Sequence, residues 1–363
     1  MFGKSSMILA SGGAAPDIGA IVALVPSDAG VHAYSQKLEI SPDGLHLYGN
    51  DYTGASKVMP HYSRDALSGL ASFVANTTAV GFPLMCRCHP TQPRLYQNQV
   101  DPTNNAGNSV RVFNRNGAGA LTFSTTFFWS SVPSLPAVGA AVTNDGSRYI
   151  AQFAGTGGLN ALNLAANGYP TTQLASLGFG LSGTTFNSNP VMSPDDAFIY
   201  CANGTYLRVV ANGASALSIA QSINVGEVIT SPVITPDGNY VYAVATVSNR
   251  IYGWSRNPTT GVLTALSPAY IATPLTSGVI YKIQMAPDGL NLYALPFNGS
   301  HAGKILCYSI GSSGKLKQLS PANFMITTGG LVSMLDMVVS PDGLNVYASN
   351  ASSIFQAARI LPA

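Results

Sequence analysis

A short turn signature recurs seven times along this chain and constrains its fold more than any other feature. Six copies consist of a small residue, Pro-Asp-Gly or a close variant, and alternating apolar residues that end in tyrosine or its equivalent. These six copies lie at 41–48, 143–150, 193–200, 235–242, 286–293 and 340–347. A seventh copy at 89–96, His-Pro-Thr-Gln-Pro-Arg-Leu-Tyr, keeps the first proline and the Leu-Tyr end but lacks Asp-Gly.

The spacing of the copies predicts one blade of a propeller for each. The proline position of the signature, which is asparagine in one copy, falls at residues 42, 90, 144, 194, 236, 287 and 341. Intervals of this length correspond to one four-stranded blade. Proline presets φ, aspartate bonds to its own backbone and glycine allows a positive φ, so we assign the aspartates to turn formation. The flanking apolar alternation indicates a hairpin between the innermost strand and the next.

A second signature accounts for the outer pair of strands. It consists of an aromatic residue, Ser-Arg, a turn, and then Gly and Leu, as at 62–70 and 254–263. Looser copies occur at 113–121 and 308–316. Copies that carry both signatures contain two hairpins, and therefore all four strands of a blade. We predict an all-β, seven-bladed propeller with four-stranded blades.

The last blade lacks its fourth strand in the sequence. After Tyr347 the chain holds only enough residues for a third strand, at 353–360, whereas strand-like segments at 7–10 and 20–25 precede the first blade. An open ring would leave an unpaired sheet edge. We therefore predict one domain over residues 1–363, with blades at 36–360 and a closing strand in the N-terminal segment 1–35.

The composition limits the classes of partner that the chain is expected to bind. Charged residues make up only 9%, against about 25% in ordinary soluble domains. The net charge of +2 and the lack of a basic stripe argue against nucleic acid. No apolar run approaches the roughly 18 residues of a membrane helix, and the N-terminus is a poor signal peptide. Little charge repulsion separates copies, which favours a protein held within an assembly or in an extracellular setting over a concentrated cytosolic enzyme. Without a signal peptide or membrane helix, we expect a virion or the cytoplasm as its location.

Residues that could carry metal or cofactor chemistry have simpler interpretations. The four cysteines show no zinc spacing, and we expect buried thiols. His89 follows Cys86-Arg-Cys88 but occupies the place of the turn serine. No G-x-S-x-G elbow or phosphate-binding glycine loop is present. The sequence therefore predicts no metal and no cofactor.

The two signatures together resemble those of the lactonase-like seven-bladed propellers, the family of bacterial 6-phosphogluconolactonase, over residues 36–360. The resemblance implies the same architecture and suggests a sugar-lactone hydrolase acting at the central channel. Enzymes of that family carry an Arg-Pro-Arg-His stretch before one turn and an Asn-Glu pair after a Leu-Tyr-Val strand. Here residues 228–234 and 281–285 lack the first motif, and Gln97-Asn98-Gln99 stands in place of the second. No catalytic residue is therefore carried over.

The repeat also aligns positions that face the axis of the ring. Counting five residues back from each turn proline gives Lys37, Met85, Gly139, Asn189, Ser231, Lys282 and Asp336. Three of these seven positions are charged, and they fall on blades one, six and seven, which are neighbours once the ring is closed. Two residues further along, Glu39, Arg87 and Gln284 are also polar. One interpretation is a pocket for a small polar or anionic ligand; the other is a set of salt bridges around ordered water.

Two classes of function remain open from the sequence. The first is a non-catalytic structural or recognition propeller that binds other protein subunits of a larger assembly, such as a bacteriophage virion, as a tail or surface protein. The low charge and the lost enzyme motifs favour this class. The alternative is a sugar-lactone hydrolase of the 6-phosphogluconolactonase type.

Overall fold

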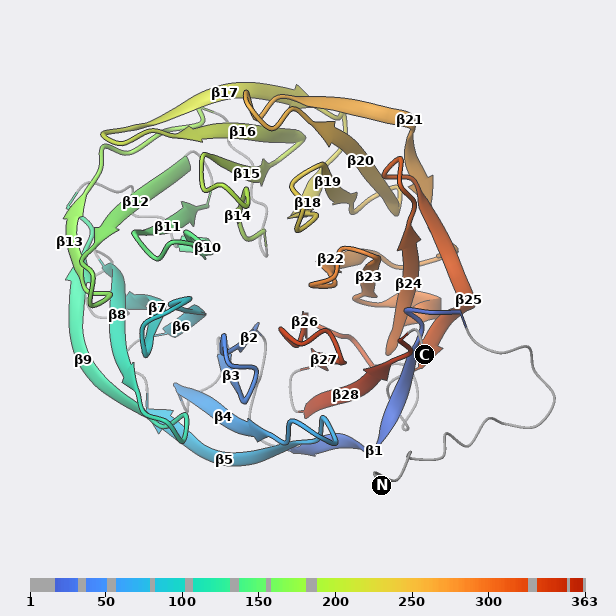
Figure 1. The fold of residues 1–363 in the computed structure, drawn as a ribbon, viewed down its shortest axis with the longest axis horizontal. Coiled ribbons are helices and arrows are strands. Elements are labelled where there is room, and N and C mark those ends of the chain that lie inside the picture. Colours follow the sequence, from blue (N-terminus) through green and yellow to red (C-terminus); the bar gives the residue numbers. More distant parts are fainter. Residues whose placement is uncertain are drawn as a thin grey trace.

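The computed structural model describes residues 17–31, 37–50, 57–78, 82–101, 107–130, 137–154, 158–180, 188–325, 332–350 and 353–361. Within them the strands form seven four-stranded antiparallel sheets. Figure 1 shows these sheets as the blades of a ring, with the first strand of each blade innermost and the fourth at the rim. The predicted all-β, seven-bladed propeller is confirmed.

Six blades follow the chain in order, each a simple meander of four strands. Blades one to three comprise β2 (Lys37–Ile40), β3 (His46–Asn50), β4 (Val58–Arg64), β5 (Ala71–Thr78); β6 (Phe82–Cys88), β7 (Arg94–Asp101), β8 (Gly107–Arg115), β9 (Leu121–Phe128); and β10 (Ala137–Val142), β11 (Arg148–Phe153), β12 (Gly158–Leu164), β13 (Pro170–Gln173). Blades four to six comprise β14 (Val191–Met192), β15 (Phe198–Asn203), β16 (Tyr206–Asn212), β17 (Leu217–Asn224); β18 (Ile229–Ile234), β19 (Tyr240–Ala245), β20 (Arg250–Arg256), β21 (Leu263–Ala272); and β22 (Ile280–Met285), β23 (Asn291–Pro296), β24 (Lys304–Ile310), β25 (Leu316–Met325), with the 3-10 turn η1 (Gly299–His301) between β23 and β24.

Blade seven is assembled from both ends of the chain. Its strands are β26 (Asp336–Val339), β27 (Asn345–Ser349), β28 (Ser353–Arg359) and, at the rim, β1 (Ile21–Val31). The pairing of β1 with β28 begins where Ile21 lies opposite Arg359. The predicted closure by the segment at 20–25 is therefore confirmed, whereas the alternative segment at 7–10 lies outside the described residues.

The turn signature forms the predicted hairpin between the first and second strands. In blade one the Oδ1 atom of Asp43 accepts hydrogen bonds from the Ser41 hydroxyl at 2.5 Å and from the Leu45 N–H at 3.0 Å. Gly44 follows with a φ of +71°. In blade two, Nδ1 of His89 accepts the N–H of Gln92 at 2.9 Å, so this histidine takes the place of the usual turn side chains.

In six of the seven blades the signature ends in a tyrosine that joins its blade to the next, whereas blade three has Ile150 there. The tyrosine ring is buried, and its hydroxyl donates to a glycine carbonyl that precedes the rim strand of the following blade. These bonds run from Tyr48 to Gly119, Tyr96 to Gly168, Tyr200 to Gly261, Tyr242 to Gly314, Tyr293 to Gly19 and Tyr347 to Gly69. The hydrophobic core accordingly consists of clusters between adjacent blades.

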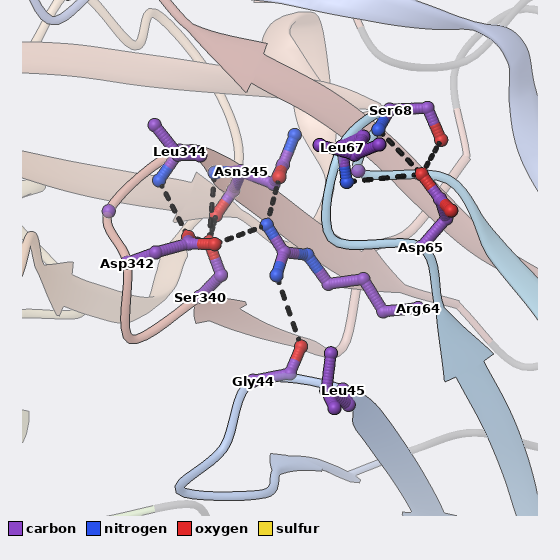
Figure 2. Close-up of polar contacts among 12 residues, drawn as sticks. Gly44, Leu45, Arg64, Asp65, Leu67, Ser68, Ser340, Asp342, Leu344 and Asn345 are labelled. Atoms are coloured by element: carbon purple, nitrogen blue, oxygen red, sulfur yellow. Dashed lines mark hydrogen bonds and ion pairs between the residues drawn. The ribbon is translucent and has the colours of Figure 1, made fainter.

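An arginine clamp spans four of the blade seams among the described residues. At the seam in Figure 2, the guanidinium of Arg64 in blade one contacts the carboxylate of Asp342 at 2.7 Å and the amide oxygen of Asn345 in blade seven. The same ion pair recurs as Arg115–Asp43, Arg256–Asp195 and Arg359–Asp288. The signature aspartates therefore do more than form turns, because the outer-hairpin arginine of the next blade pairs with them.

Candidate functional site

A cavity of about 400 Å³ lies at the centre of the ring, where the first strands of all seven blades meet. Its wall extends from the middle of these strands to the turns that follow them, since Pro90, Thr143 and Asn144 belong to the lining. Cavities of this size suit small molecules.

The structure brings four of the six predicted channel residues to the wall of this cavity. These are Glu39, Arg87, Lys282 and Gln284. Lys37 and Asp336 do not belong to the lining. They stand at the beginning of β2 and β26, and Asp336 adjoins the lining through its ion pair with Lys282.

Glu39 and Arg87 form one of the two ion pairs of the channel. Their Oε2 and Nη1 atoms lie 2.8 Å apart, and Oε1 of Glu39 accepts the N–H of Cys88 at 2.8 Å. Nε of Arg87 donates to the carbonyl of Ala140 in blade three at 2.9 Å. Burial raises the pKa of Glu39, and the nearby Arg87 limits that rise. The pair therefore joins blades one, two and three at the channel wall.

Lys282 and Asp336 form the second ion pair, between blades six and seven. Nζ of Lys282 lies 3.0 Å from Oδ1 of Asp336, and Oδ2 accepts the N–H of Leu38 in blade one at 3.1 Å. Burial alone would raise the pKa of Asp336, but Lys282 and Lys37 hold it below its usual value. Burial lowers the pKa of Lys37 to about 8, with Asp336 acting in the opposite direction.

The acidic side chains of the channel use both carboxylate oxygens in hydrogen bonds, whereas the basic side chains keep unused donors. All four carboxylate oxygens of Glu39 and Asp336 accept a hydrogen bond from the protein. Arg87, by contrast, donates from Nε and Nη1 but not from Nη2 to any described residue. Lys282 uses one of its three ammonium hydrogens in its ion pair. The unused donors at the wall are therefore cationic, and they can bind an anion.

The first strands share an irregular pairing that does not by itself decide which side chains reach the cavity. The register between first and second strands shifts between Pro83 and Met85, Ala137 and Gly139, Thr230 and Val233, and Ile280 and Lys282. A β-bulge re-aims the side chains beside it. Lys282 and Ser231 line the cavity whereas Met85 and Gly139 of the predicted ring do not.

The cavity wall also has an apolar part, which was not predicted from the sequence. Ile40, Val142, Val191, Val233 and Val339 line the cavity near the turn end of the strands. Each stands one or two residues before a turn, so the repeat itself could have identified them. They give the cavity apolar sides in addition to its polar groups.

The described part of the chain lacks two further kinds of feature. No cluster of three His, Cys, Asp or Glu side chains there could hold a metal ion. No described helix is long and apolar enough to cross a membrane.

Comparison with known proteins shows the fold of this chain. No protein-family model matches it, and neither does any curated protein. Solved structures do match: a candidate 6-phosphogluconolactonase of Bacteroides uniformis has a TM-score of 0.68 at 16% identity, covering 83% of this chain and 87% of its own. The periplasmic gluconolactonase PpgL of Pseudomonas aeruginosa has a TM-score of 0.67 at 16% identity, with 87% and 96% covered. A protein from Lactobacillus plantarum has a TM-score of 0.69 at 16% identity, also with 87% and 96% covered.

The chain is therefore a seven-bladed propeller of the lactonase-like fold, as its sequence signatures implied. This likeness is to the lactonase-like fold that the sequence signatures implied. At this level of identity it shows the architecture and leaves the activity to be argued from the channel.

Proposed function

We propose that the central cavity binds a small organic anion that carries hydroxyl groups, of the size of a sugar acid. The unused donors of Arg87 and Lys282 at the cavity wall carry this proposal. A guanidinium nitrogen with unused N–H groups, such as Nη2 of Arg87, can donate a charge-assisted hydrogen bond to a carboxylate or phosphate. Gln284, Asn189 and Ser231 line the same cavity and supply neutral polar groups for hydroxyls.

The charge balance of the channel supports an anionic ligand. Lys37, Arg87 and Lys282 outnumber Glu39 and Asp336, which leaves one positive charge in excess when Lys37 is protonated. Such an excess inside a concave site attracts anions and repels cations.

Hydrolysis of a sugar lactone at the same cavity is the second candidate. The structural similarity to a protein described as a gluconolactonase favours it. A hydrolase needs a base that activates water. Glu39 and Asp336 are both occupied by hydrogen bonds and ion pairs, so neither is poised for that role, and we place binding ahead of hydrolysis.

Calorimetric titration with gluconate and with 6-phosphogluconate tests the binding proposal. Arg87→Lys keeps the charge beside Glu39 but removes the Nη2 donor, and we expect Kd to rise about tenfold, as for the loss of a charge-assisted hydrogen bond. Lys315→Met, at an exposed lysine on an outer hairpin, is the matched control and should leave Kd unchanged. No heat of binding with either anion would contradict the proposal.

A pH-stat assay with the corresponding lactones separates the two candidates. Binding without acid release supports a ligand-binding propeller. Acid release that depends on Arg87 and Lys282 would support hydrolysis instead.

A further inference from the structure

A second cavity, of about 280 Å³, lies at the rim of the propeller, at the seam of blades five and six. Its wall is formed by β19, β20 and β21 of blade five and by the residues that begin β25 of blade six. The lining is mainly apolar and includes Tyr242, Ile251, Leu266, Tyr270 and Leu316. We call this cavity the rim hollow. It shares no lining residue with the central cavity.

A glycine in the third strand of blade five leaves this space open. Opposite the residue that ends the turn signature, the third strand of each other blade carries a side chain: His61, Val112, Ala161, Val209, Cys307 and Gln356. Blade five has Gly253 there, opposite Tyr242. The φ of Gly253 is not in the left-handed region, so the backbone does not require a glycine. A Cβ atom on Gly253 would lie 2.8 Å from Cδ1 of Leu266, so the missing side chain would occupy the rim hollow.

The rim strands of blades five and six share a wide bulge beside this position. Both contain the sequence Leu-Ser-Pro-Ala, at 266–269 and 319–322. The pairing with the third strand skips these four residues in both blades. Leu319 of blade six is buried in a core cluster that includes Cys307, whereas Leu266 of blade five is half-buried at the wall of the rim hollow. The same bulge is therefore closed in blade six and open in blade five.

A carboxylate binds the bulge of blade six. Oδ2 of Asp17 accepts the N–H of Ser320 at 2.8 Å, and the N–H of Asp17 donates to the carbonyl of Ser320 at 2.9 Å. Asp17 stands two residues before Gly19, whose carbonyl accepts the hydroxyl of Tyr293. The molecule itself thus shows which chemical group this bulge can bind.

Blade five repeats the arrangement without the carboxylate. The carbonyl of Gly314 accepts the hydroxyl of Tyr242, and the residue two positions before Gly314 is Ser312. Ser267, which is equivalent to Ser320, is exposed, and no carboxylate of the described residues contacts its backbone. A ligand could supply the group that the chain lacks here.

We propose that the rim hollow binds a small carboxylic acid that carries an apolar group of the size of a phenyl ring. The ring occupies the space that Gly253 leaves beside Tyr242, since apolar cavities of proteins take up apolar rings. The carboxylate accepts the N–H of Ser267, as a carboxylate does at the equivalent serine of blade six. Lys315, an exposed cation of the lining, supplies a positive charge for the same carboxylate.

Ligand-observed NMR titration of the full-length chain with 3-phenylpropionate tests this site. The companion probes are 3-phenylpropanol, which has the ring without the charge, and propionate, which has the charge without the ring. We expect 3-phenylpropionate to have the lowest Kd of the three. Gly253→Val introduces the residue that blades two and four carry at this position. It should raise that Kd about tenfold or more, because the valine side chain fills the hollow.

Lys315→Gln tests the carboxylate end of the site at an exposed side chain, where the substitution leaves the fold intact. We expect it to raise the Kd of 3-phenylpropionate about threefold, as for an exposed ion pair, and to leave that of 3-phenylpropanol unchanged. Lys317→Gln is the matched control, at an exposed lysine of β25 outside the lining, and should change neither value.

An absence of saturable binding of 3-phenylpropionate up to about 10 mM would overturn the proposal. So would a folded Gly253→Val variant that binds it like the unmodified chain, or a Lys315→Gln variant that weakens both ring-bearing probes equally. Weaker binding in Arg87→Lys but not in Gly253→Val would place the acid in the central cavity instead. Gluconate has no apolar group, so its binding should be the same in Gly253→Val and in the unmodified chain, and the two sites are tested separately.

Discussion

Arg64 and Asp342 stand 278 positions apart in the chain and form an ion pair of 2.7 Å. Arg64 also donates from Nε to the hydroxyl of Tyr347 at 2.8 Å, and that hydroxyl donates in turn to the carbonyl of Gly69 in blade one. The first and last blades are thus joined by a small network in addition to their packed side chains. Because Arg64 is 5% exposed, this network has little competition from water.

Removing the Arg64 guanidinium should therefore destabilise the ring. We expect Arg64→Ala to lower the free energy of unfolding by about 2–3 kcal/mol, below the usual cost of breaking a buried pair because the Asp342 carboxylate keeps contact with water. Urea denaturation followed by fluorescence measures the change. Lys317→Ala, at an exposed lysine on blade six, should leave the midpoint unchanged, and equal midpoints for both variants would refute a structural role for the clamp.

Closure by β1 leads to a second prediction. Without residues 1–31, the β28 strand would present an unpaired edge. We expect the truncated chain to melt at a lower temperature and to aggregate, and a synthetic peptide of residues 17–31 added in trans to restore part of the lost Tm. A truncated chain with the Tm of the full-length protein would show that the β1 pairing contributes nothing.

The sequence predicted the architecture because the information for it is local and repeated. Each turn depends on a few residues such as Ser41 and Asp43, and the period of the copies depends on the length of a blade. The arginines of the clamp could also have been identified from the sequence, since Arg64 and Arg256 end strands in the second signature. Their pairing with turn aspartates depends on the curvature of the ring, which no single blade encodes.

Only part of the candidate site was predicted from the sequence. Counting back from the turn correctly placed Lys282 at the channel wall, because the interval from the turn is fixed. Bulges such as the shift between Ile280 and Lys282 change which neighbouring residues face the axis. Met85 follows the same kind of shift as Lys282 but does not line the cavity, so the repeat position alone could not exclude it.

A buried histidine pair at the seam of blades one and two makes the fold sensitive to acid. Nδ1 of His46 and Nε2 of His61 lie 3.1 Å apart, and Asp43 and Arg115 are the nearby charged groups. Burial lowers the pKa of both rings, that of His61 to about 4. An unfolded histidine titrates near 6.5, so between about pH 6.5 and 4 the unfolded chain binds more protons than the folded chain. The free energy of unfolding therefore decreases as the pH is lowered through this range.

We expect the free energy of unfolding to drop from pH 7 to pH 5, with the His61 ring contributing about 2 kcal/mol of that loss. His61→Gln, which keeps a hydrogen-bonding group but cannot titrate, should show a drop smaller by that amount. Urea denaturation at the two pH values measures it. An identical drop in both proteins would remove the histidine pair from the explanation.

Lys37 makes anion binding in the central cavity depend on pH. Burial lowers the pKa of this lysine to about 8, so it carries its charge at pH 7 and loses it as the pH rises through that value. The channel then changes from one excess positive charge to none. We expect the Kd for gluconate to rise several-fold between pH 7 and pH 9, because an anion loses a favourable long-range interaction. Lys37→Met should bind more weakly at pH 7 and show a flat profile over the same range, whereas Lys315→Met should retain the slope. A slope that persists in Lys37→Met would assign the titration to another group.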